Sequence, residues 1–190
     1  VRRVRSTQAP RDVVVIGAGA FGGWTAYYLR QLGANVTLVD AYGPGNSRAT
    51  SGDETRGVRT SYGTHPQADL WMRWANQAID RWKEFDETWG KDFKLRLFFT
   101  TGDLFMREKP DPIIDKNKEF WTKLNIPFEV LKVDDIAAKY PVIDWRKITQ
   151  VLHEPRAGVV RARRACEVVA EAFRQQRGEI LMGYASPGDH

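Results

Sequence analysis

Hydrophobic and polar positions along residues 11–40 follow the pattern of a strand, a helix and a second strand. Val13–Ile16 is a run of β-branched residues, which suits a strand buried in a parallel sheet. A helix is predicted to begin near Ala20 and to end at Gly33, because glycine readily adopts the left-handed conformation that terminates helices. Val36–Val39 is the second strand. The segment is therefore predicted to be a βαβ unit of an α/β fold.

The turn between the first strand and the helix has the spacing G-x-G-x-x-G, formed by Gly17, Gly19 and Gly22. The first glycine allows a sharp turn, the second lets a pyrophosphate approach the backbone, and the third lets the helix pack closely on the sheet. Asp40 ends the second strand roughly 20 residues further on, where an acid binds the ribose of a dinucleotide. The helix N-terminus adds N–H donors and a positive dipole end. Together these features predict a dinucleotide site.

Residues 41–62 are rich in Gly, Ser, Thr and Arg and are predicted to form a long loop. The hydroxyl and N–H donors of this loop suit an anionic ligand, and so do Arg48, Arg56 and Arg59. An ordinary nicotinamide-binding domain would instead continue from the strand into another crossover helix. The loop therefore indicates a different dinucleotide class.

A strongly amphipathic helix is predicted over His65–Gly90, with Pro66 near its start. Aromatic and small residues recur on one face at helical spacing, and we interpret this face as hydrophobic core rather than as a substrate cage. The residues of this face are Trp71, Trp74, Ala75, Ala78, Trp82, Phe85 and Trp89.

The middle of the chain alternates between short strand and helix patterns. Leu95–Met106 is predicted to form two strands around a hairpin-like turn at residues 101–103. The elements predicted next are a helix at Ile113–Leu124, a strand at Pro127–Leu131, a helix at Val133–Tyr140 with Asp134 as its N-cap, and strands within Thr149–Val160.

The last helix pattern covers Arg161–Arg177, and Gly178 is predicted to end it. Glu179–Met182 is predicted to be a strand that rejoins the sheet of the βαβ unit. A second region is therefore inserted between two parts of the first domain. The predicted apolar face of the helix consists of Ala165, Cys166, Val169 and Phe173.

The composition argues against nucleic-acid binding, a membrane span and an internal disulfide. Apolar residues make up 42% of the 190 residues, which is enough for a core. The net charge of +5 comes from charges mixed along the chain, which favours a solvated surface with some anion-binding arginines over nucleic-acid binding. No apolar run reaches the length of a membrane span. The single cysteine, Cys166, excludes an internal disulfide and is interpreted as a buried, inert thiol.

Several kinds of site find no support in the sequence. His65, His153 and His190 show no metal-ligand spacing, so no metal is expected. The basic start, VRRVRSTQAP, has no hydrophobic segment behind it and is not an intact secretion signal. We expect residues 1–10 to form a flexible arm with a processed or trimmed end, and we favour a cytoplasmic location.

The glycine motif and the following GPGNSRATSGDETRGVRTSYG resemble the N-terminal half of the flavoprotein family that includes D-amino-acid oxidase, with the monomeric sarcosine oxidase and N-methyltryptophan oxidase branch the nearer match. The resemblance continues through FFTTGDLFM, IPFEVLKVDDIAAKYPVI and HEPRAGVVRARRACEVVAEAF, and so covers residues 12–186 almost completely. Many flavoproteins and dehydrogenases share the glycine motif. The GDETR-x-x-R segment at residues 52–59 is much more specific.

The resemblance implies FAD as the cofactor. It implies a Rossmann-like FAD-binding domain at residues 11–64 and 150–190, with residues 65–149 as part of an inserted α+β substrate domain, both incomplete in this chain. Thr50 and Ser51 match positions that touch the flavin cofactor. The full set of residues expected to bind FAD is Gly17, Ala18, Gly19, Ala20, Phe21, Gly22, Asp40, Ala41, Ser47, Arg48, Thr50, Ser51 and Arg56.

Two arginines carry the activity that the resemblance implies. Arg56 matches an arginine beside the isoalloxazine, whose charge favours the reduced, anionic flavin. Arg59 matches an arginine that binds the substrate carboxylate through a bidentate fork. The implied reaction moves a hydride from the substrate carbon to flavin N5 and gives an imine. Residues 50–52 are Thr-Ser-Gly where sarcosine-type oxidases carry histidines, so the substrate is expected to be another amino acid or secondary amine.

Members of this family are considerably longer than this chain, and the additional part completes the flavin and substrate sites. Three explanations fit: a split or processed enzyme in which a second chain carries the C-terminal half, a fragment made on purpose, or a remaining part that is disordered. We favour the split or processed enzyme. Two alternatives remain from the residues themselves. One is an NAD(P)-dependent dehydrogenase, and the other is a non-catalytic FAD-binding subunit.

Overall fold

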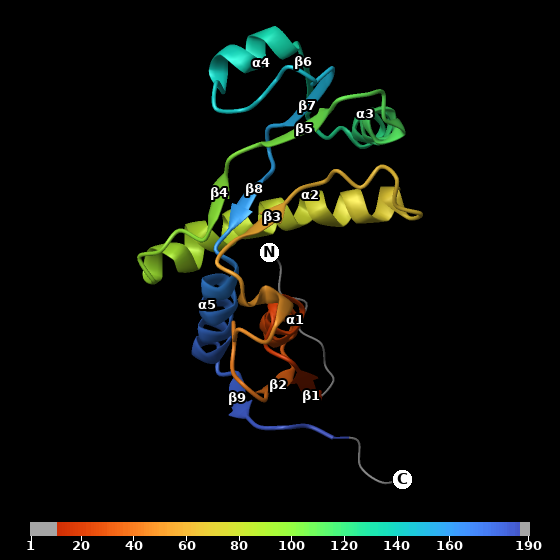
Figure 1. Ribbon diagram of the computed structural model, residues 1–190. Helices are drawn as coiled ribbons and strands as arrows, with labels where there is room; N and C mark the ends of the chain where they lie inside the picture. The colour runs from red at the N-terminus through yellow and green to blue at the C-terminus, as the bar shows by residue number, and fades with distance from the viewer. Residues whose placement is uncertain (1–10, 187–190) are drawn as a thin grey trace. The chain divides into compact units, whose positions relative to one another are not determined.

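The computed structural model describes residues 11–186 (Figure 1). The arm expected at residues 1–10 lies outside the described residues. The elements in chain order are β1 (Asp12–Ile16), α1 (Ala20–Gln31), β2 (Asn35–Asp40), the 3-10 turn η1 (Thr50–Gly52), β3 (Arg56–Val58), α2 (Ala68–Phe85), the π-helical turn η2 (Asp86–Gly90), β4 (Phe98–Thr100), β5 (Asp103–Arg107), α3 (Pro112–Leu124), β6 (Glu129–Leu131), α4 (Val133–Lys139), β7 (Gln150–Glu154), β8 (Gly158–Val160), α5 (Ala162–Gln175) and β9 (Glu179–Met182).

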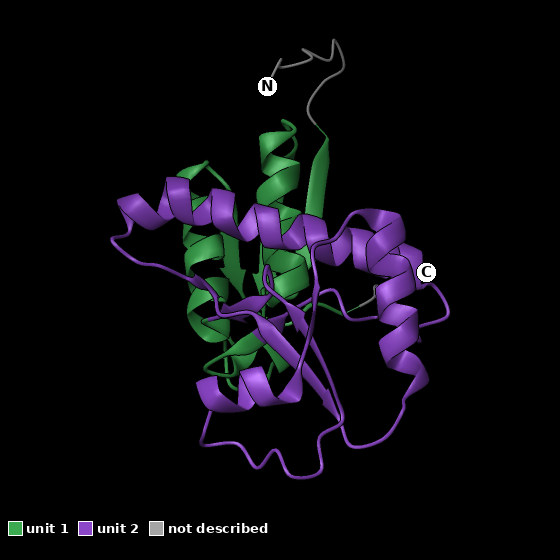
Figure 2. Ribbon diagram, turned by 90° about the horizontal axis from the view of Figure 1, so that it is seen from above, with its two compact units in different colours: residues 1–56, 161–190 green, residues 57–160 purple. Residues whose placement is uncertain are grey.

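The chain divides into two compact units (Figure 2). Unit 1 consists of residues 1–56 and 161–190, and unit 2 consists of residues 57–160. Unit 2 is thus inserted into unit 1, as expected for the predicted fold class. The sequence placed the two boundaries after residues 64 and 149, and the structure places them after residues 56 and 160. The roles of the two units in binding cofactor and substrate stay predictions.

Unit 1 is built on a parallel sheet with the strand order β1-β2-β9. The predicted βαβ unit and the returning strand are both confirmed. Helices α1 and α5 are far apart in sequence but pack against each other, as Figure 1 shows. Val36 and Leu38 of β2 are buried, with Leu38 fully so. The sheet brings the carboxyl ends of β1, β2 and β9 to one edge, where ligands bind in open α/β folds.

The two helices of unit 1 end in different ways. Gly33 has φ of +94° and ends α1 as predicted. After α5 the left-handed residue is Arg177, with φ of +66°, and not Gly178. Gly178 is required for packing instead, because a Cβ there would lie 2.2 Å from the buried ring of Phe173. The predicted apolar face of α5 is buried throughout.

Unit 2 contains two three-stranded sheets, ordered β3-β8-β4 and β5-β7-β6. The hairpin predicted around residues 101–103 is wrong. β4 pairs with β8 while β5 pairs with β7, both antiparallel, so the chain continues from one sheet into the other. Gly102 has φ of +73° and its N–H donates to the Ala157 carbonyl, so the residue forms a bend between two ladders rather than a turn that reverses the chain.

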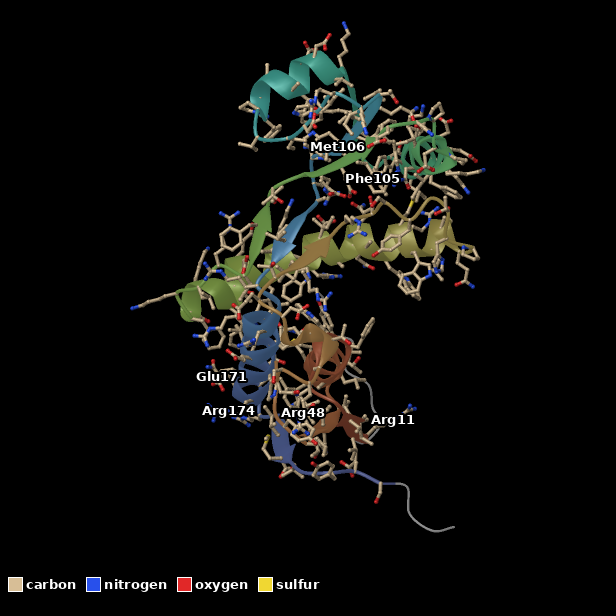
Figure 3. All side chains as sticks on the ribbon, viewed as in Figure 1. Arg11, Arg48, Phe105, Met106, Glu171 and Arg174 are labelled. Carbon is tan, nitrogen blue, oxygen red and sulfur yellow. The ribbon has the colours of Figure 1, made fainter. Side chains whose placement is uncertain are left out.

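The core of unit 2 gathers Met72, Ile114, Trp121, Ile126 and Leu152, with Phe105 (labelled in Figure 3) packed against it. The buried residues of α2 are Ala68, Met72, Ile79 and Phe85. The predicted aromatic face is therefore wrong in part: Trp74 is 56% exposed and lies edge-on against Trp71.

The remaining elements correct two predictions and confirm a third. The loop predicted at residues 41–62 contains η1 and β3. The N-cap of α4 is Lys132 rather than Asp134. Helix α3 matches its predicted range, and Asp111 caps it by accepting a hydrogen bond from the Ile113 N–H. Within residues 11–186, no helix is long and apolar enough to span a bilayer, and no group of three His, Cys, Asp or Glu side chains is placed to hold a metal ion.

Candidate cofactor site and substrate site

The glycine turn of unit 1 has the geometry that its spacing predicts. Gly17 has φ of +98°, a conformation that side chains disfavour, and its N–H donates to the Val39 carbonyl. A Cβ on residue 22 would lie 1.7 Å from the Gly17 oxygen. Gly17 is therefore required by the backbone turn, and Gly22 by the contact between α1 and that turn.

Gly19 differs from the other two glycines, because nothing in the chain itself requires it. Its φ is −76°, and a Cβ there would meet only the Ser51 Oγ, at an ordinary contact distance of 3.5 Å. Helix geometry leaves the N–H groups of the first turn of α1 without intrahelical acceptors. The N-terminus of α1 therefore fits a phosphate group that approaches Gly19 closely.

Asp40 ties the end of β2 to the glycine turn. Its Oδ2 accepts a hydrogen bond of 2.7 Å from the N–H of the fully buried Ala18. Its Oδ1 accepts 2.8 Å bonds from the N–H groups of Tyr42 and Gly43, the two residues that follow Ala41. The Asn46 Nδ2 also lies 3.5 Å from Oδ1, whereas Oδ2 has one partner only among these contacts and keeps an acceptor position that a ribose hydroxyl can fill.

The loop after β2 returns to the start of α1 through Ser51, whose Oγ accepts a 3.1 Å hydrogen bond from the Ala20 N–H. Arg163 of α5 holds the other side of η1, because its Nε donates to the Gly52 carbonyl at 3.0 Å. Burial raises the pKa of the Cys166 thiol, which also hydrogen-bonds Ser51. The interpretation of Cys166 as buried is confirmed.

The other predicted loop residues lie around η1. The Arg56 Nη2 donates to the Thr50 carbonyl at 2.8 Å and pairs with the Asp53 carboxylate at 2.6 Å. Arg56 keeps 49% of its side chain exposed. Ser47, Arg48 and Phe21 are exposed as well, with Phe21 at 88%. Their side chains are accessible, and their contacts with FAD stay a prediction.

Two tyrosines near Asp40, Tyr42 and Tyr184, were not predicted from the sequence as part of the site. Tyr184, just beyond β9, donates its hydroxyl to the Tyr42 hydroxyl at 2.8 Å, and the two rings meet edge-on. Arg48, labelled in Figure 3, stacks on the Tyr42 ring at 4.2 Å. Tyr42 could have been found from its place after Asp40, but only the pairing of β2 with β9 brings Tyr184 there.

Arg59 lies in unit 2, directly after β3. Its Nε donates to the Ser61 Oγ at 3.0 Å and lies 3.9 Å from Oδ2 of Asp103 at the start of β5. Arg59 keeps 48% of its side chain exposed. This ion pair is longer than the 2.6 Å pair of Arg56 with Asp53.

Close to Arg59 lies Glu154, a carboxyl group that the sequence did not single out as functional. Glu154 is 1% exposed and faces Asp103 in the β5–β7 ladder. Burial raises the pKa of Glu154, and the nearby Asp103 charge acts in the same direction. Hydrogen bonds from Thr60 and the positive charge of Arg59 oppose the shift of the Glu154 pKa.

A first prediction distinguishes the role of Gly19 in binding FAD from the role of Gly22 in folding. Gly19→Ala should weaken FAD binding by about tenfold or more, ~1.4 kcal/mol, and leave the unfolding temperature of the cofactor-free protein unchanged. Gly22→Ala should unfold the protein, because its Cβ overlaps the backbone. Gly23→Ala is the matched control, since its Cβ lies 3.6 Å from Val169. Normal FAD affinity in Gly19→Ala would show that no phosphate approaches this residue.

A second prediction concerns the stability of unit 2. The raised pKa of Glu154 means that folding favours the protonated carboxyl. The free energy of unfolding should therefore fall as the pH rises above 4.5, the ordinary value, relative to a Glu154→Gln variant. Urea unfolding at several pH values measures this difference. Parallel pH curves for wild type and Glu154→Gln would contradict the prediction.

Comparison with known proteins places this geometry in a family. The model of a family described as FAD dependent oxidoreductase (DAO) matches residues 12–185. Monomeric sarcosine oxidase from Arthrobacter sp. (strain TE1826) is 26% identical over 90% of this chain and 42% of the relative. N-methyl-L-tryptophan oxidase from Yersinia pestis (strain Pestoides F) is 24% identical over 90% of this chain and 44% of the relative. The chain thus spans less than half the length of these relatives.

Solved structures share the fold. L-proline dehydrogenase from P. horikoshii superposes with a TM-score of 0.74 at 20% identity, over 92% of this chain and 44% of that one. Glycine oxidase from Bacillus cereus ATCC 14579 gives a TM-score of 0.71 at 17% identity, over 91% and 46%. The predicted fold class and the predicted cofactor, FAD, are confirmed. The chain belongs to the DAO family of FAD dependent oxidoreductases.

Proposed function

We propose that this chain is part of an enzyme that oxidises the C–N bond of an amino acid or secondary amine to an imine, which water then hydrolyses. The bound flavin would supply the hydride acceptor at N5. The observation that carries this proposal is the turn at Gly19. A Cβ at this residue would fit against the rest of the chain, so no contact within the chain itself requires glycine there. The family match supports FAD as the ligand at this turn.

In this proposal the residues of unit 1 hold the cofactor. The N–H groups at the start of α1 bind the pyrophosphate, and the remaining acceptor position of Asp40 binds the adenosine ribose. Ser51 keeps η1 against the glycine turn. Arg56, held by Thr50 and Asp53, contributes a fixed positive charge that favours the reduced flavin.

Arg59 is the residue proposed to select the substrate. Its half-exposed guanidinium suits a carboxylate, which binds through two parallel hydrogen bonds. The similar proteins sarcosine oxidase and N-methyl-L-tryptophan oxidase are named after N-methyl amino acids, which supports a substrate with a carboxylate. Thr50-Ser51-Gly52 stands where sarcosine-type oxidases carry histidines, and we therefore propose a substrate other than sarcosine.

One face of the unit 1 sheet supports the proposal that a further segment completes the enzyme. Ile16, Val39 and Leu181 are register neighbours across the three strands and so share a face. On this face Val14 and Ile16 are 64% and 70% exposed, and Leu181 is 46% exposed. Parallel sheets are normally covered on both faces. We propose that the segment equivalent to the rest of the relatives covers this face, and that a second chain carries it.

A third prediction tests the role of Arg59. In the complete FAD-loaded enzyme, Arg59→Ala should raise KM for a carboxylate substrate by about a hundredfold, ~2.8 kcal/mol, without loss of bound FAD. Steady-state kinetics and the flavin absorption spectrum measure the two effects. Arg73→Ala is the control, since Arg73 pairs with Asp69 on α2. An unchanged KM in Arg59→Ala would remove Arg59 from the substrate site.

A fourth prediction tests the cofactor and the second chain. Protein purified from its natural source should show a flavin absorption spectrum, and its intact mass under denaturing conditions should reveal this chain with a second polypeptide. A single polypeptide of the relatives' length that still shows the flavin spectrum would contradict the proposed second chain and support the proposed cofactor. Bound NAD in place of flavin would support a nicotinamide-dependent dehydrogenase. Flavin that no amino acid or amine reduces would support a non-catalytic subunit.

A further inference from the structure

The buried polar side chains of the described residues gather around one segment. Four polar or charged residues are buried within residues 11–186: Thr60, Ser61, Asn117 and Glu154. Thr60 and Ser61 belong to residues 59–63, the segment that follows β3 and begins with Arg59, and Glu154 and Asn117 accept hydrogen bonds from this segment. Buried polar groups are costly unless they are hydrogen-bonded, so their concentration at one place requires a physical reason.

Glu154 holds this segment through Thr60. Its two carboxylate oxygens accept the Thr60 N–H at 2.9 and 3.0 Å, and Oε1 also accepts the Thr60 hydroxyl at 2.7 Å. The Trp121 Nε1 donates to the same hydroxyl at 2.8 Å. The Thr60 hydroxyl therefore donates in one direction and accepts from the other. Trp121, Thr60 and Glu154 form a directed chain that has one arrangement.

A second anchor lies three residues beyond Thr60. The Asn117 Oδ1 accepts the Gly63 N–H at 2.7 Å, and a Cβ on residue 63 would lie 2.6 Å from that oxygen. Asn117 and Trp121 stand four residues apart on α3, so the same helix face makes both contacts. The segment after Arg59 is thus fixed at both ends from inside unit 2.

Stability alone does not account for this arrangement. A carboxylate pays a large desolvation penalty when it is buried, and well-packed apolar residues of similar volume often stabilise a protein more. The raised pKa of Glu154 shows that the site disfavours its charged form. What the network does provide is a single backbone position at Thr60, the residue next to Arg59.

Arg59 is attached to this fixed backbone and is braced at its Nε. Ser61, itself part of the anchored segment, accepts from the Arg59 Nε at 3.0 Å. The contact with Ser61 uses the Nε–H of the guanidinium. The N–H donors of the two Nη groups can therefore bind a carboxylate. Fixing the backbone and the Nε of Arg59 therefore fixes the direction of that fork.

We infer that Glu154 and Thr60 are positioning residues that aim the Arg59 guanidinium at the substrate carboxylate. This inference rests on the proposed function, because Arg59 must bind a carboxylate for its aim to matter. Displacing such a group by about 1 Å can cost on the order of a hundredfold in the affected step. The network should therefore control recognition of the carboxylate and not the binding of uncharged compounds.

The test measures carboxylate preference in the complete FAD-loaded protein. Propionate and its uncharged analogue propionamide are titrated, and binding is followed by the flavin absorption spectrum. Wild type should prefer propionate, and Arg59→Ala should lose that preference. Thr60→Val, which removes the hydroxyl and keeps the volume, should reduce the preference by about tenfold. Thr60→Ser should restore it, and Thr60→Val should have no further effect on the preference in the Arg59→Ala background.

Two further variants guard against a simple folding defect. Glu154→Gln keeps the volume and loses one acceptor oxygen, and it should reduce the preference as Thr60→Val does. Thr122→Val is the control, because its hydroxyl donates to the Lys118 carbonyl of its own helix. Thermal unfolding accompanies each titration. Equal weakening of both ligands in Thr60→Val and Glu154→Gln would show a merely structural role and overturn the inference.

The outcomes separate this inference from the proposed function. If wild type shows no preference for propionate, or if Arg59→Ala retains it, the proposed role of Arg59 fails and the inference falls with it. If Arg59→Ala loses the preference while Thr60→Val and Glu154→Gln keep it, the role of Arg59 stands and the inference alone is wrong.

Discussion

The close approach of α1 to the turn after β1 is the constraint on which unit 1 depends. The Gly17 oxygen occupies the place where a Cβ of residue 22 would stand, so this approach exists only with glycine. It points the first turn of the helix at the carboxyl edge of the sheet. Asp40 and Ser51 then accept N–H groups from Ala18 and Ala20, which fixes the turn from two sides. The proposed pyrophosphate and ribose contacts depend on this arrangement.

The two units use polar groups in opposite ways. In unit 1, partly buried side-chain oxygens of the strand end and the loop accept backbone N–H groups at the start of α1. In unit 2, Glu154 and Asn117 lie in the interior and hold the chain segment after Arg59. In the proposed function, unit 1 thus presents backbone donors to an anion, and unit 2 sets the position of one cationic side chain.

The two arginines of the GDETR-x-x-R segment are not equivalent. Arg56 makes a short ion pair with Asp53 and also donates to the Thr50 carbonyl, so its charge is partly balanced and its position is set by the turn it holds. Arg59 faces Asp103 at a longer distance and is braced only at Nε by Ser61. A guanidinium held by a short ion pair suits the tuning of a bound cofactor, and a guanidinium held at its Nε suits capture of a carboxylate through its Nη groups.

Local sequence by itself determined the βαβ unit and the glycine turn, because each depends on backbone conformation and periodicity within a short stretch. The choice of FAD rested on the resemblance to a family of flavoproteins. Local sequence also identified α5 and β9, because the apolar residues of each element recur within its own short stretch of sequence. Tertiary structure alone decided that residues 95–106 run through two sheets, because strand partners lie far away in the chain. It alone brought Tyr184 beside Tyr42, and Glu154 beneath Thr60. Contacts between residues more than 90 positions apart leave no local pattern, and their hydrogen bonds arise only once the sheets and helices have packed.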